Sequence, residues 1–345
     1  MSGTDIDVET STGVRMFSFG DAESVLNRRD LLNNVECRFE GRWFEPPVPF
    51  KLLGRALHVQ PHHESAIRVK RNLLVKHFKP SRLLSRTAFG KFALDYLVMG
   101  NAFLEEVPNI AGRTMRLDHS LAVRTRVGKA GRAFFLPDHA WGGFGQPHEY
   151  EAGRLIHLAE PDVAQEVYGL PEYLSAMQSA FLNEAATLFR RRYYINGAHA
   201  GFVFYLSEAS MDQKDVDMVR EALREAKGVG NFKNLFINAP GGKKDGVQII
   251  PISEVAAKDE FLGIKGTTRD DILAAHRVPP QILGVVPQNN GGFGDVGKAN
   301  DIFFANEIEP LQMRFLEVND RVGEEAITFE PYRPMGNAVP ASSPA

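Results

Sequence analysis

Residues 171–198, "PEYLSAMQSAFLNEAATLFRRRYYINGA", carry the longest helical pattern in the chain and limit most strongly what it can fold into. Pro171 suits a first helical turn, and Asn196-Gly197 supplies a left-handed exit. Between them, apolar residues recur every three or four positions, at Leu174, Met177, Phe181, Ala185 and Leu188. The pattern predicts a long amphipathic helix.

The remaining patterns in the first 206 residues predict an α+β fold. Alternating apolar residues indicate strands, and apolar residues on one side of a helical repeat indicate helices. The pair Pro46-Pro47 stops the first strand, and Gly100 ends a helix because glycine readily adopts the left-handed conformation. The expected elements are a strand at 35–39, helices at 64–80 and 85–100, β-rich chain at 113–158 and a strand at 201–206.

Another helix opens at Ser210, where Ser210 and Gln213 match a capping box. Its apolar stripe is narrow and lies among charged side chains, at Val216, Val219, Leu223 and Ala226. A helix with so thin a stripe buries little surface within one chain. We therefore expect it to lie exposed or to pack against a neighbouring subunit.

The C-terminal third predicts two strands and two helical regions. Asp270-Asp271 fit the first turn of a helix that starts after Thr267 or Thr268, where acidic side chains favour the helix dipole. This structural use is expected in preference to a pair of catalytic carboxylates. The expected elements are strands at 234–238 and 247–252 joined by a hairpin at 239–246, a helical region at 254–276 that ends at Val278-Pro279-Pro280, and a helix at 298–322 with a kink or break at Pro310.

Composition narrows the possible functions. The 345 residues include 40 Lys and Arg against 43 Asp and Glu, so no bulk positive field favours nucleic acid or a membrane. Cys37 is the only cysteine, which excludes an intrachain disulfide and a multi-cysteine zinc site. No apolar run approaches the roughly 18 residues of a membrane span. With polar, flexible tails expected at 1–30 and 331–345, we predict a soluble, unexported protein.

The stretch "QNNGGFGDVGKAND" matches two nucleotide-binding patterns. Gly292, Gly294 and Gly297 fit G-x-G-x-x-G, and Gly292, Gly297 and Lys298 fit G-x-x-x-x-G-K. A phosphate-binding loop needs a strand that leads directly into it and a Ser or Thr after the lysine, whereas Ala299 follows Lys298. We favour a flexible loop between two helices, with a P-loop-like nucleotide-binding ATPase on Gly292–Lys298 as the alternative.

A histidine-rich segment, His58 to Glu64, contains residue types that can bind a metal ion. Pro61 is expected to prevent a shared helical face for His58 and His62, and neighbouring residues of a strand point to opposite sides. We therefore expect ordinary loop histidines. No pattern in the chain predicts a catalytic residue, a metal site or a cofactor.

A basic patch with aromatic neighbours lies near residue 240. It fits a solvated hairpin or the rim of a protein interface better than a nucleic-acid contact, because it is small and local. Its members are Phe232, Lys233, Phe236, Lys243 and Lys244.

Three motifs are more specific than either glycine pattern: Y-G-L-P at 168–171, F-R-R-R-Y-Y-x-N-G-A-H at 189–199 and H-R-V-P-P-Q at 276–281. With their flanks, they resemble the portal proteins of tailed bacteriophages, in particular the PBSX-type branch of contractile-tailed temperate phages. The resemblance extends over nearly the whole folded body of the chain. It implies a ring-forming, non-enzymatic protein of usually about twelve subunits at one vertex of the capsid, in the virion, after assembly in the host cytoplasm.

The resemblance also implies partners. Double-stranded DNA would pass through the ring, pumped by a separate terminase. Major capsid and scaffolding proteins would assemble around it, and head-completion and tail connector proteins would dock later. No membrane is implied, and the near-neutral charge of the chain suits a channel in which DNA must slide.

The family's division into wing, stem, clip and crown maps onto this sequence by resemblance. Clip or partner contacts are expected at Phe232, Lys233, Lys243 and Lys244, and a DNA-tunnel loop at Gln288, Asn289, Asn290, Gly291, Gly292, Phe293, Gly294 and Lys298. The expected regions are a flexible tail at 1–30, a wing at 31–209, a stem helix at 210–228, a clip at 229–252, a second stem helix at 253–277, a tunnel-loop region at 278–298, a wing or short-crown helix at 299–330 and a flexible tail at 331–345.

Overall fold

The computed structural model describes residues 37–137, 145–195, 257–285 and 295–334, together with the backbone of five strands elsewhere. The chain divides into two compact units. Unit 1 contains residues 1–25 and 182–267, and unit 2 contains residues 26–181 and 268–345. Two long helices, α5 (Met177–Ile195) and α7 (Ala257–Ala275), each have residues in both units.

Unit 1 contains a five-stranded sheet with the order β1-β2-β13-β12-β14. The central strand β12 pairs in parallel with β13 and antiparallel with β14. The strands are β1 (Val8–Glu9), β2 (Arg15–Phe17), β12 (Phe202–Leu206), β13 (Leu235–Asn238) and β14 (Val247–Pro251).

This sheet corrects two sequence predictions. Strands β13 and β14 do not form a hairpin, because β12, the apolar run "FVFYL", lies between them and pairs with both. The N-terminal 30 residues are not a structureless tail throughout. Strand β2 pairs with β13, so the backbone groups on that side of β13 gain partners from the N-terminal segment.

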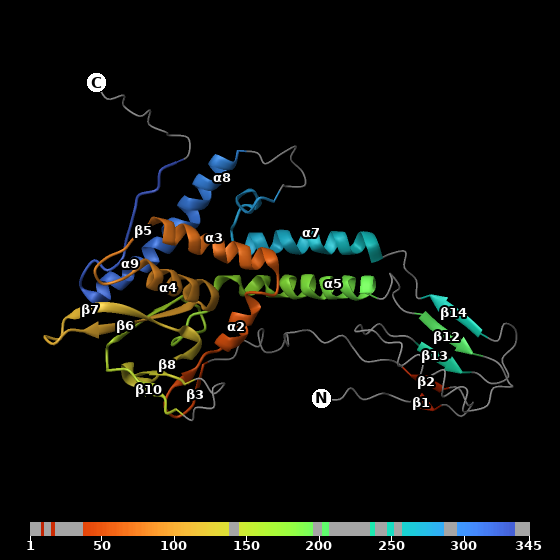
Figure 1. The fold of residues 1–345 in the computed structure, drawn as a ribbon, viewed down its shortest axis with the longest axis horizontal. Coiled ribbons are helices and arrows are strands. Elements are labelled where there is room, and N and C mark those ends of the chain that lie inside the picture. Colours follow the sequence, from red (N-terminus) through yellow and green to blue (C-terminus); the bar gives the residue numbers. More distant parts are fainter. Residues whose placement is uncertain are drawn as a thin grey trace, which may run out of the picture. The chain divides into compact units, whose positions relative to one another are not determined.

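Unit 2 combines short antiparallel sheets with packed helices (Figure 1). Its sheets are β11-β6-β7, β10-β9-β8, β15-β5 and β3-β4. The strands are β3 (Arg38–Phe39), β4 (Phe44–Glu45), β5 (Phe78–Lys79), β6 (Asn101–Pro108), β7 (Thr114–Ser120), β8 (Thr125–Val127), β9 (Ala133–Phe135), β10 (His148–Glu149), β11 (Leu155–Ala159) and β15 (Thr328–Phe329). The α+β prediction is confirmed, including the β-rich character of 113–158.

Most helices of unit 2 begin and end where capping residues, glycine and proline in the sequence predicted. Ser85 caps the start of α4 by accepting the N–H of Ala88, and Gly100 ends it with a φ of 63°. The long helix predicted from Pro171 begins as a short 3-10 helix, η4 (Glu172–Ala176), and continues as α5 from Met177, while its predicted exit at Asn196-Gly197 lies outside the described residues. The remaining helices are α2 (Phe50–Ala56), α3 (Pro61–His77), α4 (Arg86–Met99), α8 (Val296–Phe303) and α9 (Glu309–Val322).

Two expectations about helices are wrong. His58 and His62 share no helical face, as predicted, since His58 precedes α3, but His62 and His63 are not loop residues: Pro61 begins α3, because a proline at the first helical position loses no intrahelical hydrogen bond. Residues 267–268 do not begin a helix either. They lie inside the continuous helix α7, where Thr268 and Ile272 are buried, so packing overrides the weak helix propensity of that stretch.

The predicted break at Pro310 does not occur, since helical residues continue without interruption from Val296 to Val322. A π-helical turn, η6 (Phe304–Ile308), connects α8 to α9 directly before Pro310. Proline has no N–H to donate to the preceding turn, so a wider turn costs less there than elsewhere in the helix. Within this turn Phe304, Glu307 and Ile308 are all buried.

The core of unit 2 is rich in aromatic side chains. Phe78 stacks on Phe89 with ring centroids 4.1 Å apart, and Phe315 of α9 contacts Phe89 edge-on at 5.4 Å. A second cluster, built around Phe50 and Tyr168, covers the other side of α4. These contacts join α3, α4, α9 and the sheets into one body, which fixes the polar site described next.

Candidate functional site

Most of the site residues expected from sequence lie outside the described residues. This holds for Gln288–Gly294, for Phe232 and Lys233, and for Lys243 and Lys244. Lys298 is described. It lies in the first turn of α8, where its backbone N–H donates to the Asp295 carboxylate at 3.0 Å and its exposed Nζ lies 3.4 Å from the same group.

The two segments that flank residues 286–294 are well defined. On one side, α7 is followed by a short 3-10 helix, η5 (Pro280–Leu283), that ends at Gly284 with a φ of 73°. On the other side, Asp295 caps α8. Both segments connect to a polar cluster within unit 2, which we call the junction cluster: His63, Lys70, Glu172, His276, Arg277 and Glu307.

The end of α7 is an unusual helix stop. The N–H of Val278 donates to Leu273 O at 3.0 Å, and the N–H of Arg277 donates to Ala274 O at 2.9 Å. This is the hydrogen-bond pattern of a Schellman motif, whose left-handed position is usually glycine. Here Arg277 occupies it with a φ of 54°, at a cost of about 1–3 kcal/mol relative to a relaxed conformation.

The side chain of Arg277 explains why arginine stands there. Its Nε donates to Glu307 at 2.5 Å, and its terminal nitrogen donates to Glu172 at 2.5 Å. These two hydrogen bonds hold the pKa of Arg277 above its ordinary value. One side chain thus ties the end of α7 to both η4 and the π-helical turn.

Glu307 is the centre of the junction cluster. Its side chain is only 4% exposed, and it accepts from Lys70, which is equally buried on α3. With Arg277 it has two cationic partners, so the carboxylate is compensated although water is excluded. A buried carboxylate is costly to leave unpaired. The need to keep Glu307 paired therefore fixes the relative positions of α3, the end of α7 and the turn between α8 and α9.

Two buried histidines form the other part of the junction cluster. The ring nitrogens His63 Nδ1 and His276 Nε2 lie 2.9 Å apart, and Tyr173 packs edge-on against His63 at 4.5 Å. Burial lowers the pKa of His63 to about 4, and burial together with the nearby His63, Lys70 and Arg277 lowers that of His276 to about 2. Both rings are therefore neutral at pH 7, with one donating to the other.

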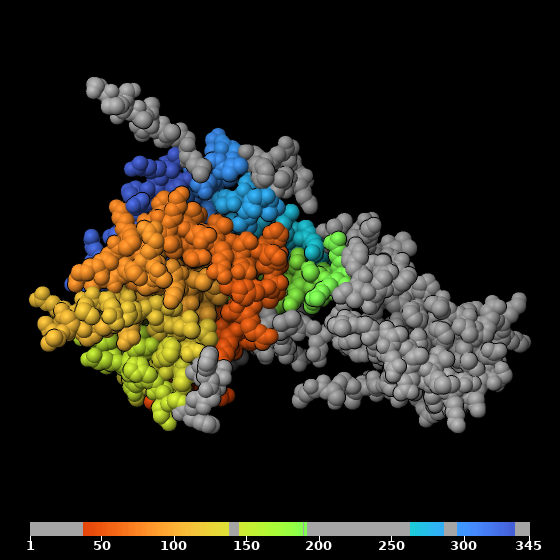
Figure 2. Space-filling view, viewed as in Figure 1, coloured from red at the N-terminus to blue at the C-terminus, as the bar shows by residue number. Residues whose placement is uncertain are grey.

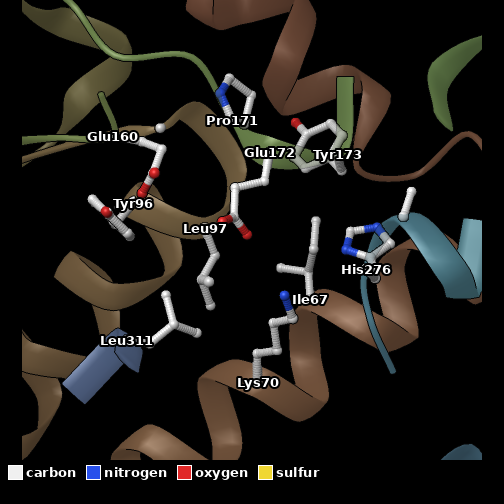
Figure 3. Close-up of a pocket in the computed structure, with 12 residues that line it drawn as sticks. Ile67, Lys70, Tyr96, Leu97, Glu160, Pro171, Glu172, Tyr173, His276 and Leu311 are labelled. Carbon is white, nitrogen blue, oxygen red and sulfur yellow. Dashed lines mark hydrogen bonds between the residues drawn. The ribbon is translucent and has the colours of Figure 1, made fainter. Parts of the chain in front are cut away.

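A small pocket of about 20 Å³ lies beside these residues, enough for about one water molecule. Figure 3 shows Lys70, Glu172 and His276 around it, with Tyr96 and Glu160 on another side. Tyr96 donates to Glu160, and burial followed by this carboxylate raises its pKa well above the ordinary range. The pocket is too small for a nucleotide, and its charged residues Lys70 and Glu172 already form ion pairs with Glu307 and Arg277.

The junction cluster is suited to positioning. Among the described residues, no group of three or more His, Cys, Asp or Glu could hold a metal ion. The histidines of the predicted loop are instead divided between surface and core. His58 pairs with Glu64 at 3.0 Å on the outside, whereas His63 is fully buried. Asp271 accepts from Ser179, which is structural use as predicted, although inside a helix.

Sequence reasoning missed Lys70, Arg277 and Glu307. One local signal was available for Arg277, since Val278-Pro279 stops the helix there and many helices end at a residue in the left-handed conformation. No local signal marks Glu307 as buried, because the sequence "ANEIEP" reads as a solvated helical surface. Its partner Lys70 is 237 residues away.

Two solved structures share the fold of this chain. The chain is similar in fold to a protein in the neck of an empty gene transfer agent (GTA) particle, with a TM-score of 0.58, 17% identity and 87% of each chain covered. It is also similar to the crystal structure of a HK97 family phage portal protein from Corynebacterium diphtheriae, with a TM-score of 0.57, 13% identity, and 81% of this chain and 94% of the other covered.

Sequence comparison identifies the family. The model of the phage portal protein family matches residues 57–322. A probable portal protein of Escherichia phage P2 is 48% identical over 94% of this chain and 93% of its own length. A probable portal protein of Haemophilus phage HP1 is 34% identical over 90% of this chain and 91% of its own length. The chain belongs to the phage portal protein family.

No helix within the described residues is both long and apolar enough to cross a lipid bilayer.

Proposed function

We propose that this chain forms a ring of about twelve subunits through which double-stranded DNA enters and leaves a phage head. The observation that carries the proposal is the family match over residues 57–322, supported by 48% identity to the probable portal protein of Escherichia phage P2. The ring would lie at the capsid vertex in the virion, after assembly in the host cytoplasm.

The finer placement of the chain within the family is part of the proposal. We assign it to the PBSX-type branch on the motifs Y-G-L-P and H-R-V-P-P-Q. Terminase would dock at the clip, residues 229–252, with contacts at Phe232, Lys233, Lys243 and Lys244. Major capsid, scaffolding, head-completion and tail connector proteins would contact the ring elsewhere.

The described helices support a division into wing and stem. Helix α7 falls inside the segment 253–277 assigned to the second stem helix, and most of unit 2 falls inside the wing assigned to 31–209 and 299–330. The first stem helix at 210–228 and the tunnel loop at 288–294 lie outside the described residues. They remain assignments by resemblance.

The junction cluster gives the proposed tunnel loop a fixed base. The segment that enters the loop follows directly from Arg277, and α8, which leaves it, continues into the turn that holds Glu307. One ion-pair network therefore joins the two segments that flank the loop. A loop anchored on a rigid base suits a channel that must contact moving DNA without binding it tightly.

The nucleotide-binding alternative gains no support from the described chain. A phosphate-binding loop requires a strand that leads into it, whereas Pro280–Leu283 forms a 3-10 helix. The lysine of the pattern, Lys298, lies beside Asp295, whose negative charge would oppose a phosphate at that position.

Two experiments test the proposal. Electron microscopy and mass measurement of the purified chain should show closed rings of about twelve subunits, and a monomer under all assembly conditions would contradict it. Thermal unfolding with saturating ATP should show no stabilisation. A shift that disappears in Lys298→Ala would instead favour the ATPase.

A further inference from the structure

The outer side of α9 carries apolar and acidic side chains without partners. Met313 is 69% exposed and Leu316 is 37% exposed. Glu309 and Asp320 lie on the same side, because the four positions follow the i, i+4, i+7, i+11 spacing of one helical face. Within the described part of the chain, neither carboxylate forms an ion pair. We call these four residues the acidic face.

A second surface has the opposite charge. The guanidinium of Arg42 lies 5.0 Å from the ring centre of Phe134 and 5.8 Å from that of Trp43. The amine of Lys129 lies 4.1 Å from the ring centre of Phe39. Among the described residues, neither cation has a carboxylate partner in a salt bridge. We call Arg42 and Lys129, with the rings beneath them, the cationic face.

The cationic face is rigid. Lys129 lies in a tight turn where Ala130 and Gly131 both have positive φ, at 56° and 74°. Gly128 packs so closely that a Cβ there would lie 2.8 Å from the Phe134 ring and 2.9 Å from a backbone oxygen. Cations held on aromatic rings by such a turn lose little further freedom when they bind a partner.

The chemistry of the cationic face favours carboxylates over a phosphate backbone. Its neighbour Arg132 is already held by Glu149 through two hydrogen bonds of 2.5 and 2.8 Å. The Glu149 carboxylate therefore adds a negative charge to the cationic face, beside Arg132. Regularly spaced phosphates would meet that charge, whereas a protein surface with two separate carboxylates and apolar side chains between them would not.

The two faces lie on different sides of unit 2. In Figure 1, α9 lies on one side of the β6–β7 pair, and β3, β8 and β10 lie on the other. The space-filling view in Figure 2 places the blue residues that include α9 and the yellow-green residues that include β8 and β9 at opposite margins of this unit. A closed ring of identical chains needs two such complementary patches on each subunit, since one face always meets the other.

We propose that the acidic face of one subunit docks on the cationic face of a second copy of this chain. The inference rests on the proposed ring and adds the residues that close it. Met313 and Leu316 would cover the part-exposed rings of Phe39 and Trp43, while Glu309 and Asp320 would pair with Arg42 and Lys129. Both apolar burial and charge pairing would then select the correct neighbour.

Two variants of the full chain test this directly. The acid-reversed variant carries Glu309→Arg and Asp320→Arg, and the base-reversed variant carries Arg42→Glu and Lys129→Glu. The acid-reversed variant breaks no ion pair among the described residues, so its thermal unfolding before assembly should match that of the natural chain. The base-reversed variant also loses the cation–π contacts of Arg42 and Lys129, so its Tm should fall slightly while its unfolding stays cooperative. The matched control is Arg113→Glu, an exposed charge reversal in the turn between β6 and β7.

Mass photometry and negative-stain images should show a loss of rings of about tenfold or more for each variant alone, because like charges would meet at every interface. An equimolar mixture should recover rings, since the reversed acidic face of one variant pairs with the reversed cationic face of the other. The control should assemble normally.

Normal rings from either variant alone would overturn the proposed contact, and so would a mixture that fails to recover them. If the reversals leave the rings intact but abolish binding to DNA or to another phage protein, the cationic face serves that partner instead. Failure of the natural chain to form rings is a separate outcome, which contradicts the proposed function itself.

Discussion

Substituting Glu307 by glutamine tests the role of the junction cluster. Glutamine keeps the size of the side chain and removes its charge, so Lys70 is left buried, at 4% exposure, without a carboxylate partner. Breaking a buried ion pair by removing one partner costs about 3–5 kcal/mol. For a body of the size of unit 2, with about 2–4 °C for each kcal/mol, this corresponds to a fall in Tm of about 6–20 °C.

Thermal and urea unfolding of the Glu307→Gln variant measure this cost. Two comparisons make the result specific. Arg82→Ala removes an exposed pair with Glu324 and should cost less than about 1 kcal/mol. The double variant Lys70→Met with Glu307→Gln removes the stranded charge and should recover part of the loss. A cost for Glu307→Gln no larger than that of Arg82→Ala would refute the reasoning.

Three further results are expected. Burial lowers the pKa of His63 to about 4, below the 6.5 of an exposed histidine, so the unfolded chain binds more protons between these pH values and stability falls as the pH drops below 6.5. Denaturation at pH 5 and pH 7 should show this loss, and the loss should be smaller in His63→Leu than in the control His148→Ala. The same pH dependence in both variants would contradict it. Gly169→Ala should destabilise the fold by about 3 kcal/mol or more, because its Cβ would lie 2.2 Å from the backbone oxygen of Glu160. Gly112→Ala should cost about 1 kcal/mol, because a Cβ there contacts no other atom and only the positive φ is unfavourable. Equal melting temperatures for the two variants would count against this packing. Deleting Asn290–Gly294 should spare ring assembly but impair DNA packaging or retention, and normal packaging by deletion rings would rule out an essential tunnel role.

Elements with strong local signals were predictable from sequence. Gly100 and Ser85 mark the ends of α4, and Pro171 marks the start of the segment that becomes α5. Each signal acts through the backbone of its own turn, so no distant contact is needed to interpret it. The alternating runs in 113–158 predicted strands for the same reason.

Long-range packing decided the rest. Residues 267–268 look like a helix start, yet burial of Thr268 and Ile272 continues α7 through them. The pairing of His63 with His276 joins residues 213 positions apart, and Lys70 with Glu307 joins residues 237 apart. The residues next to a buried charged side chain do not differ from those next to a solvent-exposed one. The junction cluster could therefore not be predicted from local sequence.

The most direct test of the portal assignment is the mass and symmetry of the assembled protein. Native mass measurement of the purified full chain, combined with electron microscopy of the same sample, should give one closed ring of about twelve 38.3 kDa subunits around an open channel. A protein that stays monomeric under all assembly conditions, or that forms open filaments in place of closed rings, would contradict the assignment.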